Sequence, residues 1–198
     1  MKIIQCQQGT EEWIKARIGT PSASNFDNTI TTKGEPSKQR TKYMYRLAGE
    51  FVSGRAEETF QSLAMAKGVE TEAEARSVYE MATGEKVEQV GFCLHDTINA
   101  GCSPDGLVGK NGGLELKCPL VATHVSYLLD GKLPTEYFTQ VQGSLFITGL
   151  KWWDFMSYSA GLKPFITRVK PDATFHAALE VELRLFTREL QEIINKIK

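Results

Sequence analysis

The sequence predicts an α/β fold: a central mixed β-sheet flanked by helices, with a long helix at the C-terminal end. Three observations predict this class. Helical patterns dominate residues 10–82, short apolar strand-like segments follow over residues 87–117, and helical and strand patterns then alternate up to a long amphipathic stretch. The order of helices, strands, helices, strands and a final helix is typical of an α/β sandwich with a mixed sheet.

The first half of the chain predicts mostly helices. Thr10 can cap a short helix over residues 10–19, whose first turn is acidic and which ends at Gly19. Residues 31–40 are polar and contain glycine and proline, which predicts a mobile loop. The expected helices are 10–19, a second one through residues 20–27, about 41–52, about 57–66, and 71–82 before Gly84.

The second half predicts the sheet and the helices that cover it. Apolar runs bounded by glycine, proline and polar residues indicate strands. The last segment repeats apolar residues at helical spacing from Phe175 to Ile197, and we expect this face to pack on the sheet. The expected elements are strands 87–94 and 100–102 joined through His95-Asp96, a hairpin over 105–115, helices 122–129 and 135–147, strands 152–158 and 165–169 joined across Gly161, and the final helix.

Length and composition predict one globular domain over residues 1–198. The chain has 41% hydrophobic and 24% charged residues, which is ordinary for this class. A formal net charge of −1 gives no global sign of a nucleic-acid partner, so any DNA surface must come from local charge separation. No segment resembles a secretion leader or a membrane span, and we expect no membrane partner.

The four cysteines show no paired spacing. Cys6, Cys93, Cys102 and Cys118 form no CxxC, zinc-ligand or iron–sulfur pattern, and three of them lie in apolar strand-like segments. Free buried thiols are the commonest explanation for such positions. They predict a reducing, cytoplasmic environment.

The most informative motif combines two carboxylates and a lysine. Asp105 lies between proline and glycine, and Glu115-Leu116-Lys117 follows after a glycine-rich stretch. Because side chains i and i+2 of a strand share a face, Glu115 and Lys117 point the same way. Asn111-Gly112-Gly113 predicts a hairpin turn that brings Asp105 opposite Glu115. The trio could hold one or two Mg²⁺ ions and polarise a water beside a phosphodiester, although ordinary surface charges have the same spacing in many proteins.

Several further motifs, in this order and spacing, resemble a known family. They are Trp13-x3-Arg17-x-Gly19, Ser22-Ala23-Ser24, Gly68-x3-Glu72-x2-Ala75-Arg76, Cys102-Ser103-Pro104-Asp105-Gly106, Gly113-Leu114-Glu115-Leu116-Lys117-Cys118-Pro119 and Gln140-Val141-Gln142. Over about residues 10 to 160 the chain resembles the lambda-exonuclease-like, YqaJ-type viral recombinase nucleases of the PD-(D/E)xK superfamily. The resemblance implies a restriction-endonuclease-like core.

The resemblance also implies an activity. Family members digest linear double-stranded DNA from an end in the 5′ to 3′ direction, with Mg²⁺ as cofactor and Mn²⁺ as a possible substitute. The expected products are 5′-mononucleotides and a 3′ single-stranded overhang. The family implies a ring-shaped homotrimer, a single-strand annealing protein as partner in phage-type recombination, and a phage or prophage gene acting in the bacterial cytoplasm.

The resemblance assigns roles to the central trio and to an acid upstream of it. Asp105 and Glu115 would be metal ligands together with the backbone carbonyl of Leu116, and Lys117 would position or help deprotonate the attacking water. Glu72 matches a metal-site acid, which could act through a water. The alternative for Glu72 is a surface pair with Arg76, four positions on.

For two polar positions the sequence leaves both a functional and a structural role open. The family has an acid about ten residues before the Pro-Asp pair, but this chain is one residue shorter there, so either His95 or Asp96 could fill the place, or Asp96 could be a solvated turn residue. Gln142 shares a helix face with apolar residues and matches the family's glutamine near the scissile phosphate. Gln140 is expected to be structural or exposed to solvent.

Arg17 and Ser24 match the family's 5′-phosphate pocket. An arginine can clamp a phosphate with two hydrogen bonds, and Ser22 to Ser24 at a helix start offer N–H groups and hydroxyls. The alternative for Arg17 is an interaction with the carboxyl end of its own helix. Capture of a terminal phosphate would explain digestion from 5′ ends.

A basic segment precedes and enters the expected helix 41–52. Basic groups there could follow the DNA backbone while apolar residues between them separate the terminal base pairs, or the segment could be a solvated helix face. The residues proposed for DNA contact are Lys38, Arg40, Lys42 and Met44.

Two other functions remain open. One is a site-specific or structure-selective endonuclease with the same metal core, which would cut closed circular DNA. The other is a non-catalytic scaffold that binds DNA ends, although a scaffold needs no such set of acids and a lysine.

Overall fold

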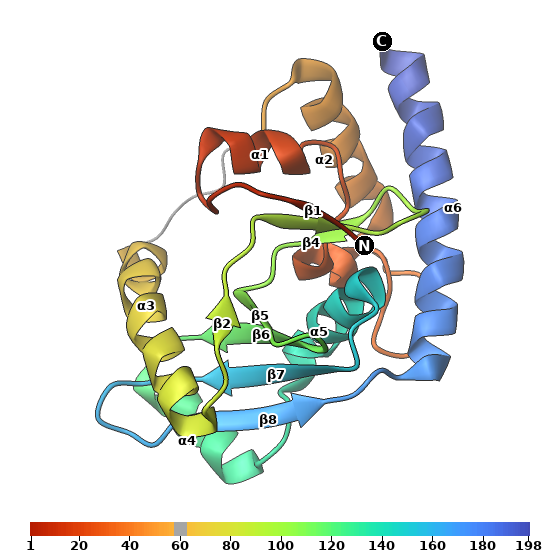
Figure 1. Cartoon of the computed structure of the whole chain (residues 1–198). Helices are drawn as coiled ribbons and strands as arrows, with labels where there is room; N and C mark the ends of the chain where they lie inside the picture. Colours follow the sequence, from red (N-terminus) through yellow and green to blue (C-terminus); the bar gives the residue numbers. More distant parts are fainter. Residues whose placement is uncertain (58–62) are drawn as a thin grey trace.

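The computed structural model describes residues 1–57 and 63–198, with the backbone alone over residues 63–70 (Figure 1). Within this part of the chain the predicted α/β fold is confirmed, because a mixed five-stranded sheet is flanked by helices and a long helix comes last. The elements are β1 Lys2–Ile4, α1 Glu11–Arg17, the 3₁₀ helix η1 Ala23–Asn28, α2 Arg40–Ser53, α3 Leu63–Thr83, β2 Val87–Glu88, β3 Phe92–Leu94, β4 Gly101–Cys102, β5 Gly106–Val108, β6 Gly112–Lys117, α4 Val121–Asp130, α5 Thr135–Thr148, β7 Trp152–Ser157, β8 Phe165–Val169 and α6 Ala173–Ile197.

The main sheet places β6 at its centre. Its strand order is β2-β5-β6-β7-β8, in which β6 and β7 run parallel and the other neighbours antiparallel. Every residue of β6 from Gly112 to Leu116 is buried, as expected for a strand that is covered on both faces. The polar residues of β6 therefore lie on a buried central strand and not on an exposed edge strand.

The β5–β6 hairpin has the predicted register but not the predicted turn. Gly106 pairs with Leu114 and Val108 with Gly112, which sets Asp105 opposite Glu115 as expected. The turn itself is residues 109–111, and Gly112 and Gly113 are paired strand residues. A Cβ atom on either glycine would lie 2.2 or 2.3 Å from the ring of Trp152 or Trp153. These glycines are thus needed for close packing on β7 and not for a turn.

The expected strand over residues 87–94 is wrong as a single element. β2 pairs with β5 in the main sheet, whereas β3 pairs with β1 and β4 in a separate antiparallel sheet. Gly91, between them, lies so close to the N-terminal segment that an added Cβ would meet Cys6 Sγ at 2.4 Å. The chain therefore leaves one sheet and joins the other within three residues, which an apolar run alone does not reveal.

Most expected helices occur, with two differences. The segment at 20–27 forms the short 3₁₀ helix η1 instead of an α-helix. The helix expected at 57–66 falls partly outside the described residues, and from Leu63 the backbone runs as one helix, α3, into the region expected for 71–82. Residues 31–39 contain neither helix nor strand beyond an isolated bridge from Ile30 to Pro36, in agreement with the predicted loop.

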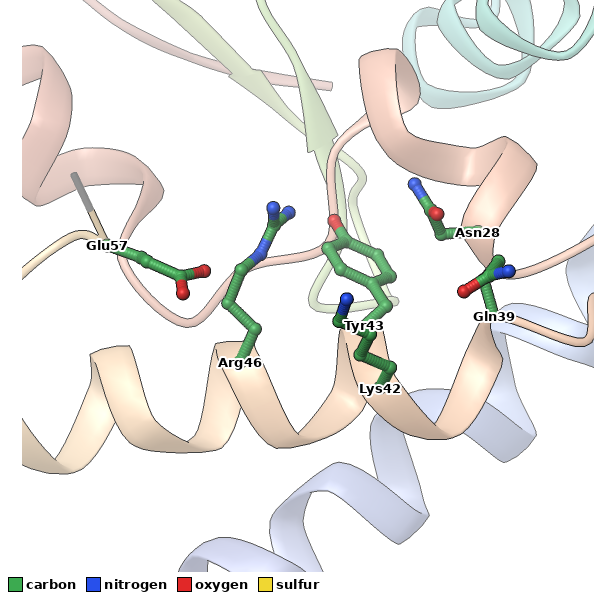
Figure 2. Close-up of a pocket in the computed structure, with 6 residues that line it drawn as sticks. All are labelled: Asn28, Gln39, Lys42, Tyr43, Arg46 and Glu57. Carbon is green, nitrogen blue, oxygen red and sulfur yellow. The ribbon is translucent and has the colours of Figure 1, made fainter. Parts of the chain in front are cut away.

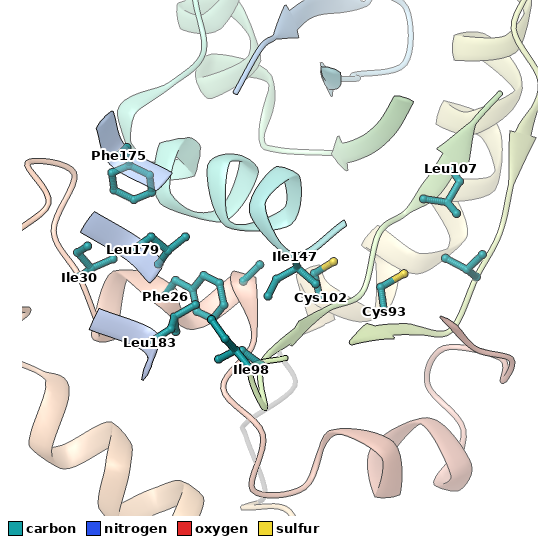
Figure 3. Packing of buried hydrophobic residues seen from close by; sticks show 13 residues of the cluster. Phe26, Ile30, Cys93, Ile98, Cys102, Leu107, Ile147, Phe175, Leu179 and Leu183 are labelled. Carbon is teal, nitrogen blue, oxygen red and sulfur yellow. The ribbon is translucent and has the colours of Figure 1, made fainter. Parts of the chain in front are cut away.

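The C-terminal helix packs on helices and not on the main sheet. α6 lies along one side of the molecule beside α2 and α5 (Figure 1), and its strongest packing partner is α2. Figure 3 shows Leu179 and Leu183 of α6 against Phe26 and Ile30, in a cluster that also includes Cys102. The amphipathic pattern correctly predicted a buried face but could not identify the element that covers it.

The cysteines agree with the expectation of free thiols. All four cysteines are free, and Cys93 and Cys102 are buried opposite each other on β3 and β4. In the described part of the chain, no helix combines the length and the apolar character that a membrane crossing requires.

Candidate active site

Asp105 and Glu115 meet at one end of the β5–β6 hairpin. The Asp105 N–H donates to Leu114 O (3.1 Å), and its Oδ2 accepts from the Leu116 N–H (2.6 Å), so the backbone of β6 fixes the carboxylate. Glu115 is only 2% exposed. Burial and then the neighbouring Glu115 charge raise the pKa of Asp105 well above its usual range. Two carboxylates are thus held together where water screens them poorly.

Lys117 supplies a positive charge to this pair. Its Nζ lies 2.5 Å from Glu115 Oε1 and 5.2 Å from the centre of the Tyr137 ring. Burial by itself would lower the pKa of Lys117, but the charges of Glu115 and Asp105 outweigh burial, and the pKa is raised. Lys117 is therefore a cation beside the two carboxylates. Tyr137, which reaches Lys117 from α5, was not among the site residues predicted from the sequence.

Glu72 on α3 lies near enough to the trio for its charge to interact with Lys117 and Glu115. Ala75 and Tyr79 on its helix face pack in a core cluster with residues of β6, which turns Glu72 towards the trio. Burial raises the pKa of Glu72, and the charges of Arg76 and Lys117 oppose that rise. Among the described residues Glu72 forms no ion pair with Arg76. The alternative role of Glu72, an ion pair with Arg76, is therefore not found in this structure.

The donor set suits Mg²⁺ if a backbone carbonyl takes part. Among the described side chains, no three acid, histidine or cysteine groups form a metal cluster by themselves. No hydrogen bond from a described residue reaches Asp105 Oδ1 or Glu115 Oε2, which leaves both oxygens free to coordinate. Lys117 O accepts from Tyr158 N on the β7 side. Because successive carbonyls of a strand point to opposite edges, Leu116 O points to the Asp105 side. Hard oxygen ligands of this kind match Mg²⁺.

The structure places Gln140, not Gln142, at the cluster. Gln140 Nε2 donates to Glu115 Oε1 (2.6 Å). Gln142 is 2% exposed and lies away from the cluster: its Nε2 donates to Lys170 O (2.9 Å), and its Oε1 accepts from the Asp172 N–H (2.9 Å). The prediction for Gln142 is therefore corrected. α5 is buried on most sides, so its apolar pattern could not show which glutamine faces the acids, although Gln140 shares a face with Tyr137 three residues before it.

The two glutamines should separate function from stability. We expect Gln140→Ala to reduce nuclease activity with little change in the free energy of unfolding. Gln142→Ala should lower that free energy by roughly 1–3 kcal/mol, because it leaves the Asp172 N–H without its partner, while the folded variant keeps its activity. Urea denaturation and nuclease assays on both variants give the comparison. Loss of activity in the Gln142 variant, together with normal activity in the Gln140 variant, would instead make Gln142 the functional residue.

Arg17 lies at the end of α1 in a polar cluster with Ser22 and Ser24, which we name the Arg17 pocket after its predicted role. Its guanidinium stacks over Trp13 (4.0 Å to the ring centre), and its Nη2 lies 3.4 Å from Ser22 Oγ. Ser22 Oγ is in turn 3.2 Å from Ser24 Oγ. Trp13 Nε1 also donates to Ser103 Oγ (3.0 Å), two residues before Asp105. The structure thus brings Arg17 and Ser24 together and links their pocket to the hairpin that carries the acids.

The basic segment is only partly available to DNA. Arg40 pairs with Glu182 and with Glu189 (2.6 Å to Oε2) on α6, so it anchors the start of α2. Met44 is 3% exposed and packs against α6, so it cannot separate base pairs. These two predictions are corrected: helical periodicity turns Met44 inward, and the acids of α6 are distant in sequence. Lys38 and Lys42 are exposed.

The remaining basic residues predict a specific salt dependence. Neutralising Lys38 and Lys42 with glutamine should make the salt slope of DNA binding shallower by roughly one unit per lost phosphate contact. Arg40→Gln should instead lower stability and leave the slope unchanged. Titrations of a duplex at several salt concentrations measure both effects. An unchanged slope in the lysine variants would remove the segment from the DNA-binding surface.

Asp96 lies outside the acidic cluster. Its carboxylate is 2.8 Å from the N-terminal ammonium of Met1, and this contact lowers the pKa of Asp96. The neighbouring His95 stacks on Phe146 (5.0 Å between ring centres), and its Nδ1 accepts from two N–H groups of the turn. Both residues stabilise the β3–β4 connection. Asp96 is therefore a solvated turn residue, which was the alternative to an acid of the active site.

Comparison with known proteins identifies the family. The family model of the YqaJ-like viral recombinase domain matches residues 12–151, which contain the acidic cluster, Lys117, Gln140 and the Arg17 pocket. A comparison with curated protein sequences gave no significant match.

Solved structures agree with this match. The chain is similar to the alkaline exonuclease LHK-Exo from Laribacter hongkongensis, with 38% identity, a TM-score of 0.86, and coverage of 95% of this chain and 96% of that one. The complex of LHK-Exo with dAMP gives 38% identity, a TM-score of 0.87 and coverage of 96% of both chains. A phage-related exonuclease from Haemophilus somnus 129PT shares the fold at 11% identity, with a TM-score of 0.69 and coverage of 90% and 96%. The chain therefore belongs to the YqaJ-like viral recombinase domain family.

Proposed function

We propose that this protein is a Mg²⁺-dependent exonuclease that degrades linear double-stranded DNA from 5′ ends. The observation that carries the proposal is the convergence of Asp105, Glu115 and Lys117 at one end of the β5–β6 hairpin, beside Gln140 and Glu72. The similarity to an alkaline exonuclease over nearly the whole chain supports it. So does the dAMP bound to that relative, since a 5′-mononucleotide is the product that such digestion would release.

Each residue of the cluster has a role that fits its position. Asp105, Glu115 and the Leu116 carbonyl would hold the metal, with Glu72 acting through a water. Bound Mg²⁺ would polarise a water and offset charge on the scissile phosphate. Lys117 would orient the attacking water and stabilise the developing negative charge, and Gln140 would keep Glu115 in place. Arg17 and Ser24 would hold the 5′-terminal phosphate, near the segment that leads to Asp105.

Linear and closed circular duplexes of the same sequence distinguish an exonuclease from an endonuclease. In the presence of Mg²⁺ we expect digestion of the linear form to 5′-mononucleotides and residual single strands, and no nicking of the circle. Removal of the metal with EDTA should stop digestion, and restored Mg²⁺, or Mn²⁺ in its place, should restart it. Cutting of the circle would favour the endonuclease alternative. Binding of ends without any cleavage would favour the non-catalytic scaffold.

We further propose that the protein works as a homotrimeric ring, together with a single-strand annealing protein in phage-type recombination in the bacterial cytoplasm. A ring through which one strand leaves would explain processive digestion and a 3′ single-stranded product. Light scattering coupled to size-exclusion chromatography should give about three times the chain mass of 22.1 kDa. A monomer at working concentration would contradict the ring.

A further inference from the structure

A second arginine, Arg46, lies beside the Arg17 pocket. Burial lowers the pKa of Arg17, the nearby Tyr43 and Glu50 oppose that shift, and the Arg46 charge adds to it. Arg46 comes from α2, whereas Arg17 ends α1, so tertiary packing brings the two guanidiniums together. Two like charges in a partly buried place repel each other unless an anion lies between or beside them.

Arg46 belongs to the same hydrogen-bonded group as the serines. Its Nη2 donates to Asn25 Oδ1 (3.2 Å). Asn25 Nδ2 in turn donates to Ser24 Oγ (3.2 Å) and to Ser22 Oγ (3.4 Å), the atom that Arg17 also reaches. Arg17 and Arg46 therefore approach one cluster of hydroxyls from two sides.

Neither guanidinium has an acidic partner in the described part of the chain, where eight ion pairs involve neither Arg17 nor Arg46. Arg46 Nε is buried and lacks a hydrogen-bond acceptor among the described residues, and the group rests over the Tyr43 ring (4.9 Å). Arg40, six residues earlier on the same helix, pairs with two glutamates. Since a buried cationic donor without a partner is costly, the Arg46 arrangement suits an external anion.

An open pocket gives access to this group. Asn28, Gln39, Lys42, Tyr43, Arg46 and Glu57 line a cavity of about 430 Å³ (Figure 2). Figure 2 shows Lys42, Tyr43 and Arg46 rising from α2 into the cavity, with Glu57 beyond Arg46. The Tyr43 hydroxyl accepts from the Ser22 N–H (3.2 Å), which ties the cavity wall to the serine cluster. Arg46 therefore lines the cavity and, through Asn25, also contacts the serines that Arg17 reaches.

We propose that Arg46 is a second phosphate-binding guanidinium, and that Arg17 and Arg46 together select a 5′-terminal phosphate monoester over a phosphodiester. This inference rests on the proposed function and adds the residue that determines its end specificity. A phosphate monoester carries about −1.5 to −2 charges at pH 7, whereas a diester carries one. Two unpaired guanidiniums stabilise the dianion more than the monoanion, so Arg46 favours chain ends over internal linkages.

Binding to three DNA hairpins tests the selection without cleavage. The hairpins share one sequence and carry a 5′-phosphate, a 5′-methyl phosphate or a 5′-hydroxyl at the single open end, and binding is measured by fluorescence anisotropy in EDTA. We expect the unmodified protein to prefer the 5′-phosphate over the 5′-methyl phosphate. Arg46→Gln should reduce that preference by about tenfold, the magnitude of one charge-assisted hydrogen bond. Arg46→Lys should reduce it less, because the charge remains.

Lys42→Gln is the matched control, because Lys42 lines the same cavity on the same helix. It should weaken binding of all three hairpins by one common factor. The inference is overturned if Arg46→Gln, with normal thermal unfolding, also weakens binding of all three hairpins by one common factor. It is likewise overturned if that variant keeps the full preference for the 5′-phosphate over the 5′-methyl phosphate. If the unmodified protein already binds all three hairpins equally, the proposed capture of 5′-phosphate fails as well, which separates the two claims.

Discussion

Replacing Lys117 with methionine should slow DNA degradation by roughly 10²–10³-fold, the range expected for loss of a group that stabilises charge in the transition state. The ammonium group is the cation that lies against Glu115 at the centre of the acidic cluster. Methionine keeps the length of the side chain but removes its charge, so the attacking water would lose its orienting group and the developing negative charge its counter-ion. Initial rates of nucleotide release from a linear duplex in Mg²⁺ measure the effect.

Lys110→Met provides the control, because Lys110 is exposed in the turn of the same hairpin. The control variant should degrade DNA at the normal rate. Binding of a DNA end by the Lys117 variant should remain measurable, since the Arg17 pocket is unchanged. A Lys117 variant that degrades DNA about as fast as the Lys110 variant would contradict the assigned role.

The largest effect on stability should come from Asp154→Ala, at about 3 kcal/mol. Asp154 on β7 is 1% exposed, and it accepts hydrogen bonds from Arg168 Nε and Nη2 (both 2.8 Å) and from the Tyr79 hydroxyl (2.7 Å). Its removal leaves these donors without their acceptor. Arg168 is half exposed and can turn to water, so we place the cost at the low end of the range for buried pairs.

The same substitution should also affect the active site. Tyr79 lies on α3 two turns after Glu72, and its bond to Asp154 ties α3 to the sheet. Urea denaturation measures the change in the free energy of unfolding, with the exposed Asp130→Ala as control. An unchanged unfolding midpoint would show that the network contributes little. A stable variant that also keeps full nuclease activity would show that Tyr79 does not help to place Glu72.

The sequence predicted those parts of the fold and site that depend on local spacing. The register that sets Asp105 opposite Glu115 follows from the length of the hairpin, and the shared direction of Glu115 and Lys117 follows from the pleat of a strand. Helix ends such as the capped start of α1 at Thr10 were also predictable, because capping is a local interaction.

The features that were not predictable depend on partners distant in sequence. Gly112 and Gly113 resemble turn residues until the tryptophans of β7 are placed over them. Met44 and Arg40 resemble DNA contacts until α6 is packed against α2. Gln140 and Gln142 cannot be told apart from the sequence, because α5 has no clearly exposed face, and only the position of Glu115 decides between them.

Digestion of duplexes that carry a 5′-phosphate on one strand only tests the central claim most directly. Each strand is labelled in turn at its 3′ end, and Mg²⁺ starts the reaction with the unmodified protein or with Glu115→Ala. The account predicts that only the phosphorylated strand shortens, from its 5′ end, and that the complementary strand stays intact as a 3′ overhang, while the Glu115 variant is inactive. Equal shortening of both strands, or full activity of the variant, would contradict the assignment of the acidic cluster and the Arg17 pocket.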